Sequence, residues 1–490
     1  MIRPQQTLAF LLALGVLGFG LMSLAGEEGF RIGSVVVRYP NWESFTRKDT
    51  TQKVNMEAIL RAGHLSALDS TRKAEEAAAA EQEALRKEQE RIQRMLAARK
   101  LQFAEKSDRL KHFQNALQQL ASGGKLRILH FGDSQIEGDR ISSLLRQRWQ
   151  EQYGGYGPGM QAAVPLAPNF SIRQTYSPQW KRYAYYGRKD TNIRHDRFGY
   201  MAVIGRYSSP IADSLLSDSS TAWLRFESAK SAYGRARNFS KLLLYLGGHS
   251  RPVNLQLMVN DSLHEQRLLP PADSIIRLKW NLPQVTQSCQ LNFQGPHSPD
   301  VYGISLEGQG GIVLDNIPMR GASGLVFSKL EASTTRAMLQ AEPVHLVLLQ
   351  YGGNTVPYIK DEAHAEQYAR QLRRQIQLLK KWLPKASFVL IGPSDMSTKK
   401  GTDFVTYDAV PWVRNALRSM ALEEGIGFWD IYGAMGGRNA MPAWVNAKPP
   451  LAGADHIHFT PQGAKQVAEW LYQAFEEELH STPPAKDPAS

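Results

Sequence analysis

At 490 residues the chain is longer than one hydrophobic core usually serves, so two or more domains are expected. Its formal charge is +12, but no stripe of arginine and lysine interleaved with aromatic residues is present, which argues against nucleic acid as a partner. The single cysteine, Cys289, excludes an intrachain disulfide and any metal site built from several cysteines, and it is expected to be a small core residue.

Residues 1–25 predict a signal peptide or a membrane anchor. Arg3 precedes an uncharged run from Leu8 to Ala25, whose length is marginal between a signal-peptide core and a membrane-spanning helix. Ser23 and Ala25 form the small-x-small pattern that signal peptidase favours. Cleavage and retention both stay open. In either case we expect the rest of the chain to be exported to the periplasm, with anchoring to the inner membrane if the segment is retained.

Residues 26–121 are expected to form an N-terminal region that contains a long helix. The stretch from about 71 to 121 is rich in Ala, Glu, Lys, Arg and Gln, and apolar residues recur in it every seven positions, at Leu96, Phe103, Leu110 and Leu117. Arg99 and Lys106 interrupt the companion positions. The pattern fits a solvated single helix, a stalk that packs on the next domain, or a short coiled coil through which the chain self-associates.

The segments 122–160 and 306–480 predict an α/β domain. Leu126–Phe131 is a continuous apolar run between glycines, and a helix is expected after it from about Ile141 to Tyr153. Similar runs and further helices alternate along the chain, which indicates a parallel sheet covered by helices on both faces. The predicted strands are Val344–Gln350, Ser387–Ile391 and Ile426–Ile431, and the predicted helices are at about 362–383, 411–424 and 461–477.

Residues 161–305 interrupt this domain with a different pattern of apolar residues. Helical periodicity is lost, and short β-type runs separated by turn residues replace it, which is typical of an antiparallel β-sandwich. These runs are Trp223–Phe226, Lys241–Leu246, Val253–Val259, Ser274–Trp280 and Cys289–Phe293. The last ten residues, 481–490, are polar and contain prolines, and they are expected to be a disordered tail.

Gly132-Asp133-Ser134 follows the first predicted strand directly. Reactive groups in open α/β sheets lie just beyond the carboxyl ends of the strands, so Ser134 is a candidate nucleophile. Its alternative is a Ser or Asp that only caps the next helix. The same segment carries Gln135 and Glu137, for which the sequence indicates no role.

Two glycine-containing loops follow in the second part of the α/β domain. Gly321-Ala322-Ser323-Gly324 can present a backbone N–H to a developing oxyanion, although such a cluster is more often a turn. Gly352-Gly353-Asn354 follows a predicted strand, and Asn354 can turn a side-chain amide into the same space.

Asp455 and His458 lie three residues apart, just before the helix that Pro461 opens. This spacing places a carboxylate beside an imidazole, so that the carboxylate fixes the tautomer while the other ring nitrogen accepts a proton. Capping of the helix by Thr460 with incidental histidines is the alternative. A metal site at His456 and His458 is a weaker one, because no third ligand is evident.

Taken in order, GDS, a loop Gly, GGN and DxxH resemble the four blocks of the SGNH hydrolases. The resemblance implies a flavodoxin-like, three-layer α/β/α parallel sheet, here with the inserted antiparallel β-sandwich and the N-terminal helical segment. It implies that Ser134 is the nucleophile, that His458 is the base and that Asp455 orients it. The oxyanion hole would comprise the N–H of Ser134, Gly324 and the side chain of Asn354, supported by Asp133 and Gly353. Gly321 competes with Gly324, and no cofactor or metal is implied.

The β-rich insertion, the exported chain and the stretch VYGISLEGQGGIVLDNIPMRGASG resemble the peptidoglycan O-acetylesterases of Gram-negative bacteria, in which the insertion is similar to a carbohydrate-binding module. The expected reaction is deacetylation of a cell-wall glycan, with acetylated peptidoglycan as the partner. Three alternatives stay open: an O-acetyltransferase, a deacetylase of another polysaccharide, and a non-catalytic scaffold that binds the cell wall. A lipase or thioesterase on the same fold would need a large apolar acyl pocket.

Overall fold

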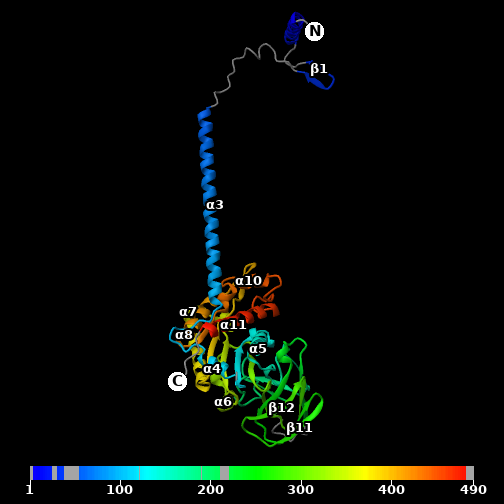
Figure 1. Cartoon of the computed structure of the whole chain (residues 1–490), viewed down its shortest axis with the longest axis vertical. Coiled ribbons are helices and arrows are strands. Elements are labelled where there is room, and N and C mark those ends of the chain that lie inside the picture. Colours follow the sequence, from blue (N-terminus) through cyan, green and yellow to red (C-terminus); the bar gives the residue numbers. More distant parts are fainter. Residues whose placement is uncertain are drawn as a thin grey trace. The chain divides into compact units, whose positions relative to one another are not determined.

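A computed structural model of the chain describes residues 4–24, 30–37, 55–120, 122–188, 190–209 and 220–481 (Figure 1). The chain divides into two compact units, Met1–Arg86 and Lys87–Ser490. Beyond Ser481 the predicted tail lies outside the described residues, as does Ala25 at the predicted cleavage site.

The first unit contains a helix and a small hairpin. Helix α1 is Pro4–Leu24, and strands β1 (Phe30–Ile32) and β2 (Val35–Val37) pair antiparallel around a turn at Gly33, whose φ is +65°. Helix α3 (Met56–Ala98) begins in this unit and ends in the second one. Among the side chains that the structure describes, no helix is both long and apolar enough to cross a membrane.

The predicted helix over 71–121 is wrong in its C-terminal half, because α3 ends at Ala98 and a separate helix, α4, spans Lys111–Leu120. Between them Gln102 exchanges two backbone hydrogen bonds of 2.9 Å with Phe428, in the edge strand β20 (Gly427–Trp429). The linker therefore satisfies the backbone groups of a strand edge that would otherwise be open. Phe103 and Leu110, two of the predicted heptad positions, lie in this linker and not on a helix.

The second unit contains the expected parallel sheet, with five strands in the order β15-β3-β16-β17-β20. Every neighbouring pair is parallel. Four of these strands correspond to the predicted ones, and β15 was not predicted. The strands are β15 (Gly311–Pro318), β3 (Lys125–Gly132), β16 (Val344–Gln350), β17 (Ser387–Ile391) and β20.

Alternate residues of each strand face opposite helical layers, which confirms the three-layer α/β/α architecture. In β3, Ile128 packs with α5 and α11, whereas Leu129 packs with α7 and α8. Figure 1 shows these two helix pairs on opposite sides of the sheet. The helices and short helical turns are α5 (Ser142–Tyr153), α6 (Ala332–Gln340), α7 (Glu362–Trp382), α8 (Ala409–Glu423), α9 (Ile431–Met435), α10 (Ala440–Val445), α11 (Pro461–Ser481), η1 (Ser134–Asp139), η3 (Gly234–Arg237), η4 (Phe327–Lys329) and η5 (Gly353–Tyr358).

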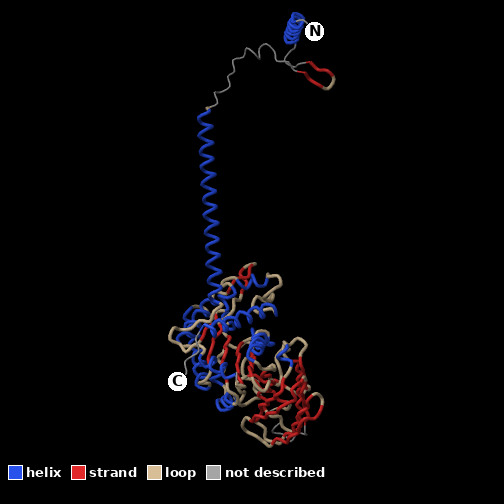
Figure 2. The backbone as a smooth tube through the Cα atoms, viewed as in Figure 1, coloured by secondary structure: helices blue, strands red, loops and turns tan. Residues whose placement is uncertain are grey.

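The insertion forms the expected antiparallel sandwich, visible in Figure 2 as the region rich in red strands. One sheet has the order β11-β10-β13-β8-β5 and the other β12-β9-β14-β7-β6, with β4 added to β14. Cys289 is buried in the core between them, as predicted. The strands are β4 (Gly159–Gln161), β5 (Ile172–Tyr176), β6 (Lys181–Ala184), β7 (Val203–Arg206), β8 (Ser220–Ser228), β9 (Phe239–Gly247), β10 (Val253–Val259), β11 (Ser262–Leu269), β12 (Ile276–Thr286), β13 (Ser288–Gly295) and β14 (Asp300–Glu307).

The sandwich leaves and rejoins the parallel sheet at one place. The N–H of Ile312, at the start of β15, donates to the carbonyl of Gly154 at 2.9 Å, so the two ends of the insertion touch. Buried Arg127 of β3 pairs there with Glu307 of the sandwich and, at 2.5 Å, with Asp315 of β15. A small antiparallel hairpin, β18 (Ser397–Lys400) and β19 (Asp403–Thr406), follows β17.

Candidate active site

Ser134 lies at the carboxyl end of β3, where the chain turns into η1. A Cβ at Gly132 would lie 3.2 Å from the carbonyl oxygen of Gln350, so the turn passes close to β16. The carboxylate of Asp133 accepts the N–H of Gln135 at 2.9 Å and caps the turn. The predicted capping role therefore belongs to Asp133, and the Ser134 hydroxyl remains available.

The Ser134 hydroxyl lies 2.8 Å from Nε2 of His458, and Nδ1 of the same ring lies 2.7 Å from Oδ2 of Asp455. The structure thus brings together the three residues that the sequence predicted as nucleophile, base and orienting carboxylate. Thr460 also caps α11, because its hydroxyl accepts the N–H of Gly463 at 3.2 Å. The loop therefore contains both predicted features. Asp455 and His458 form the carboxylate–imidazole pair, and Thr460 caps the helix.

The Asp455 carboxylate is held in its charged form by its own loop. Partial burial acts to raise its pKa, but hydrogen bonds from the His458 ring and from the N–H groups of His458 and Ile457 outweigh burial, so the pKa lies below its usual value. Both of those N–H groups reach Oδ1 at 3.0 Å. Oδ1 of Asp455 therefore binds the backbone of the loop, while Oδ2 faces the imidazole.

Asn354 joins the second and third predicted segments. Its side-chain nitrogen donates to the carbonyl of Ala322 at 3.1 Å, which leaves its second N–H for another acceptor. Gly324 is buried with φ +79°, and a Cβ there would lie 2.8 Å from the Tyr351 ring. Gly321 is exposed, and a Cβ there would meet no atom within 4 Å. Packing therefore favours Gly324 as the loop glycine of the site.

Asp133 and Gly353 lie beside each other beneath the site. A Cβ on Gly353 would be 3.6 Å from Oδ2 of Asp133, so the glycine lets the third segment pass close to the carboxylate. Burial raises the pKa of Asp133 to about 6, against the opposing effects of the Gln135 N–H and of His458. Asp133 is thus a buried carboxyl group beneath the cleft, with a pKa well above its usual value.

Comparison with solved structures gives a match over most of the chain. A peptidoglycan O-acetylesterase superposes with a TM-score of 0.59 at 22% sequence identity, over 76% of this chain and 97% of that one. The chain has the SGNH hydrolase fold. An active-site mutant of a family two carbohydrate esterase from Clostridium thermocellum has 10% identity over 63% of this chain and 99% of its own, with a TM-score of 0.25. An acetyl xylan esterase has 16% identity over 33% and 81%, with a TM-score of 0.26. No family model matches the chain, and no curated protein is significantly similar to it.

In this SGNH fold the sequence missed the part played by Gln135. Its side-chain amide donates to the carbonyl of Ile457 at 2.7 Å and to the hydroxyl of Ser394 at 3.3 Å. The residue after Ser134 is therefore bonded to the residue before His458. The only sequence signal was its place beside the GDS motif, since neither periodicity nor spacing indicates where a glutamine side chain reaches.

His456 is not arranged as a metal ligand. Its ring stacks on Phe404 of β19 at 3.7 Å between centroids and an angle of 8°, and its carbonyl accepts the N–H of Ser397 at 3.0 Å. Over the described ranges, no group of three or more His, Cys, Asp or Glu residues could hold a metal ion. His456 thus joins the loop of His458 to the β18–β19 hairpin.

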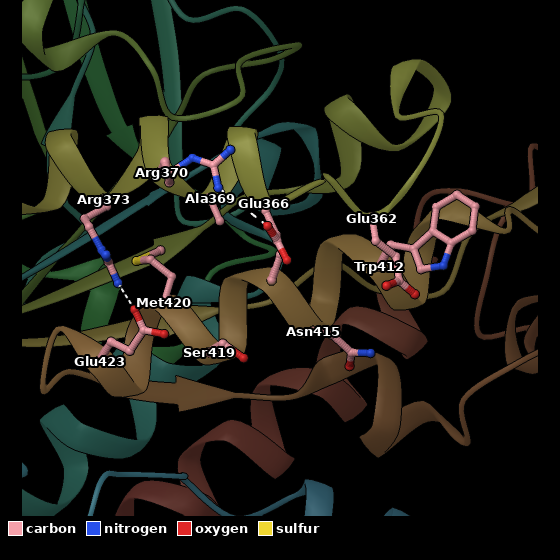
Figure 3. Close-up of a pocket in the computed structure, with 11 residues that line it drawn as sticks. Glu362, Glu366, Ala369, Arg370, Arg373, Trp412, Asn415, Ser419, Met420 and Glu423 are labelled. Atoms are coloured by element: carbon pink, nitrogen blue, oxygen red, sulfur yellow. Dashed lines mark hydrogen bonds and ion pairs between the residues drawn. The ribbon is translucent and has the colours of Figure 1, made fainter. Parts of the chain in front are cut away.

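A cleft of about 200 Å³ opens beside the Ser134–His458 pair, and Ser134, Asn354 and His458 all line it. A larger groove of about 440 Å³ lies between α7 and α8 (Figure 3). Both arginines of this groove pair with its glutamates, Arg370 with Glu366 at 3.5 Å and Arg373 with Glu423. None of the predicted site residues lines that groove, so the cleft at Ser134 is the candidate active site.

Proposed function

We propose that the protein is a serine esterase that removes O-acetyl groups from a cell-wall glycan, peptidoglycan, through an acyl-enzyme. The observation that carries this proposal is the continuous hydrogen-bonded series from the Ser134 hydroxyl through His458 to Asp455. A hydroxyl paired with an oriented imidazole is the arrangement that activates serine for attack on esters.

In the proposed reaction the Ser134 oxygen attacks the ester carbonyl while Nε2 of His458 takes the hydroxyl proton. The tetrahedral intermediate collapses to acetyl-Ser134, and His458 returns the proton to the sugar oxygen as the C–O bond breaks. Water then attacks the acetyl group with His458 again as base, which releases acetate and restores the hydroxyl. Asp455 stabilises the imidazolium in both halves of the cycle.

The oxyanion is assigned to the N–H groups of Ser134 and Gly324 and to the side chain of Asn354. Each donor of this kind is typically worth about 3 kcal/mol in the transition state. The bond from Asn354 to Ala322 supports the assignment, because it holds the amide against the loop that carries Gly324. Donors that are held in place before the substrate binds need little reorganisation during the reaction, and the Asn354–Ala322 bond supports such an arrangement.

The size of the cleft supports a short acyl group. Small-molecule pockets usually measure about 300–1,000 Å³, and the cleft at Ser134 measures about 200 Å³. An acetyl group fits this space better than a long acyl chain does. The fold of the matched structure, a peptidoglycan O-acetylesterase, supports the choice of glycan.

The proposed place of action is the periplasm. The apolar segment from Leu8 to Ala25 supports export, either as a cleaved signal peptide or as an anchor in the inner membrane. Apolar side chains of α3 are exposed, among them those of Leu85, Ile92 and Leu96, which supports self-association through this helix.

Hydrolysis of a short aryl acetate by the wild type and by Ser134→Ala tests the esterase. We expect the variant to lose at least about 10³-fold in kcat/KM, because the members of such a triad act as a unit. Ser419→Ala, which changes an exposed serine of α8, is the matched control and should keep wild-type activity. A fluorophosphonate should label Ser134 in the folded protein. Equal activity of the wild type and Ser134→Ala would refute the proposal, and the absence of both hydrolysis and labelling would favour a binding scaffold.

A further inference from the structure

A second pocket, of about 610 Å³, is lined in part by the two segments that directly follow Ser134 and His458. Glu137, Gly138 and Arg140 line it and follow Ser134 directly in the chain, and Phe459 and Pro461 line it just after His458. The same two segments that carry the Ser134–His458 pair therefore also form this pocket. Its volume lies in the range of sites that hold a small molecule or one sugar residue.

Two cations of the pocket have no carboxylate partner. In the described part of the chain, no Asp or Glu lies within ion-pair distance of Arg140 or of Lys465 on α11. Arg140 is half-buried, and its guanidinium donates only to backbone carbonyls, those of Glu137 at 2.9 Å and of Phe459 at 3.4 Å. Burial lowers its pKa, although the charges of Glu137 and Asp455 act in the opposite direction. A cation in this setting gains from an anion more than an exposed one does.

The carboxylate on the pocket wall offsets these charges only in part, because it is also paired with a third cation, Arg320. Glu137 is buried, and its Oε2 accepts two hydrogen bonds from Arg320, at 2.6 and 3.1 Å, so its charge is already paired. Pro461 and Gln462 on the same wall are the first residues of α11, a helix of 21 residues. The N-terminal end of a helix favours negative charge, which adds to the effect of Arg140 and Lys465.

Two aromatic rings from the inserted sandwich complete the pocket. Phe170 and Tyr233 lie with their ring centroids 5.3 Å apart. The N–H of Phe170 donates to the carbonyl of Gly138 at 2.9 Å, and the hydroxyl of Ser231 donates to the carbonyl of Phe170 at 2.9 Å. The sandwich is thus bonded directly to the loop that follows Ser134, and it supplies an apolar surface on which a sugar ring can pack.

We propose that this pocket is a subsite for a sugar residue of the glycan that bears a free carboxylate, as muramic acid does where it carries no peptide, with Arg140 and Lys465 binding the carboxylate and Phe170 and Tyr233 packing against the ring. The proposal rests on the proposed function and deepens it, because it selects acidic glycans over neutral ones such as xylan. It also gives the insertion a part in choosing the substrate.

Two probes that differ only in charge test the subsite. One is the disaccharide of N-acetylglucosamine and N-acetylmuramic acid, whose lactyl ether carries the carboxylate, and the other is the same disaccharide with that carboxyl amidated. Binding of both to the full chain is measured by calorimetry, and acetate release is measured on their O-acetylated forms. We expect the wild type to favour the acidic probe by about 10-fold or more in Kd and in kcat/KM, as for a charge-assisted contact.

Lys465→Gln and Arg140→Gln should each reduce this preference, and the double variant should bring it close to one. Lys465 is exposed, so its variant keeps the test decisive if Arg140→Gln fails to fold. Lys385→Gln removes an equal charge from an exposed loop before β17 and should keep the wild-type preference. No preference in the wild type, or the same preference in Lys465→Gln, would overturn the subsite. If binding prefers the acidic probe while no ester is cleaved, the esterase proposal fails and the subsite stands.

Discussion

The side-chain amide of Gln135 donates a 2.7 Å hydrogen bond to the backbone carbonyl of Ile457. Ser134 precedes Gln135 and His458 follows Ile457, so this bond joins the two segments that carry the groups proposed to exchange a proton. Ser394, just after β17, receives the other hydrogen bond of the same amide. Two segments that follow strands and the loop before α11 are thereby held at one point, which makes Gln135 a positioning residue.

Gln135→Leu should lower kcat for an aryl acetate by about 10- to 100-fold and leave KM nearly unchanged. A displacement of about 1 Å between reacting groups is enough for a loss of this size. Steady-state kinetics separate the two parameters, and Gln473→Leu, which changes an exposed glutamine of α11, serves as the control. A rise in KM with wild-type kcat would mean that Gln135 acts on substrate binding and not on the Ser134–His458 pair.

Gly324→Ala should destabilise the protein more than Gly321→Ala does. Both glycines have positive φ, +79° and +77°, so each variant incurs about 1–2 kcal/mol of backbone strain. Only at Gly324 does the new Cβ collide, at 2.8 Å from Tyr351 and 2.9 Å from Leu372. We expect Gly324→Ala to lose at least about 1 kcal/mol more in urea unfolding, and to lose esterase activity as well. Equal losses of stability in the two variants would contradict the close packing of Gly324 against Tyr351 and Leu372.

Asp133→Asn should stabilise the folded chain at neutral pH. The pKa of Asp133 is raised to about 6 from 3.8, so the folded state holds the proton more tightly than the unfolded state between these values. The wild type therefore loses stability from this group as the pH rises from about 4 to 6, and the loss amounts to about 3 kcal/mol above pH 6. Asparagine keeps the acceptor for the Gln135 N–H and removes the charge.

Unfolding by urea at pH 4 and at pH 7.5 measures the effect. The difference in stability between Asp133→Asn and the wild type should grow with pH, whereas Asp403→Asn, at an exposed position, should show no such growth. A difference that shrinks toward pH 7.5 would mean that the Asp133 carboxylate stabilises the fold.

The sequence was informative where the signal is local. The apolar runs of β3 and β16 each end in a glycine-containing loop, and this alone predicts that Ser134 and Asn354 share one edge of the sheet. The spacing of Asp455 and His458 likewise predicts their contact, since a short loop closes it. Each of these signals depends on a few neighbouring residues, so it can be recognised in the sequence before the fold is known.

The features that the sequence did not predict depend on partners far along the chain. Strand β15 carries Asp315 and Asn316 in its middle, and these polar residues break the apolar pattern. Both are buried because Arg127 and the hydroxyl of Ser142 pair with them, at 2.5 and 2.8 Å. The end of α3 at Ala98 has the same origin, because the backbone of Phe428 captures Gln102 although no glycine or proline stops the helix.

Because Gly154 and Ile312 are in contact, the sandwich could be gained or lost as a unit in evolution. A single recombination event at that junction would add or remove the whole β module while the parallel strands keep their order. Its acquisition would still need local adaptation, because Arg127 takes one of its two carboxylates from the module. A lineage that gains such a module would thus change the surface beside the loop that follows Ser134 without rebuilding the Ser134–His458 pair.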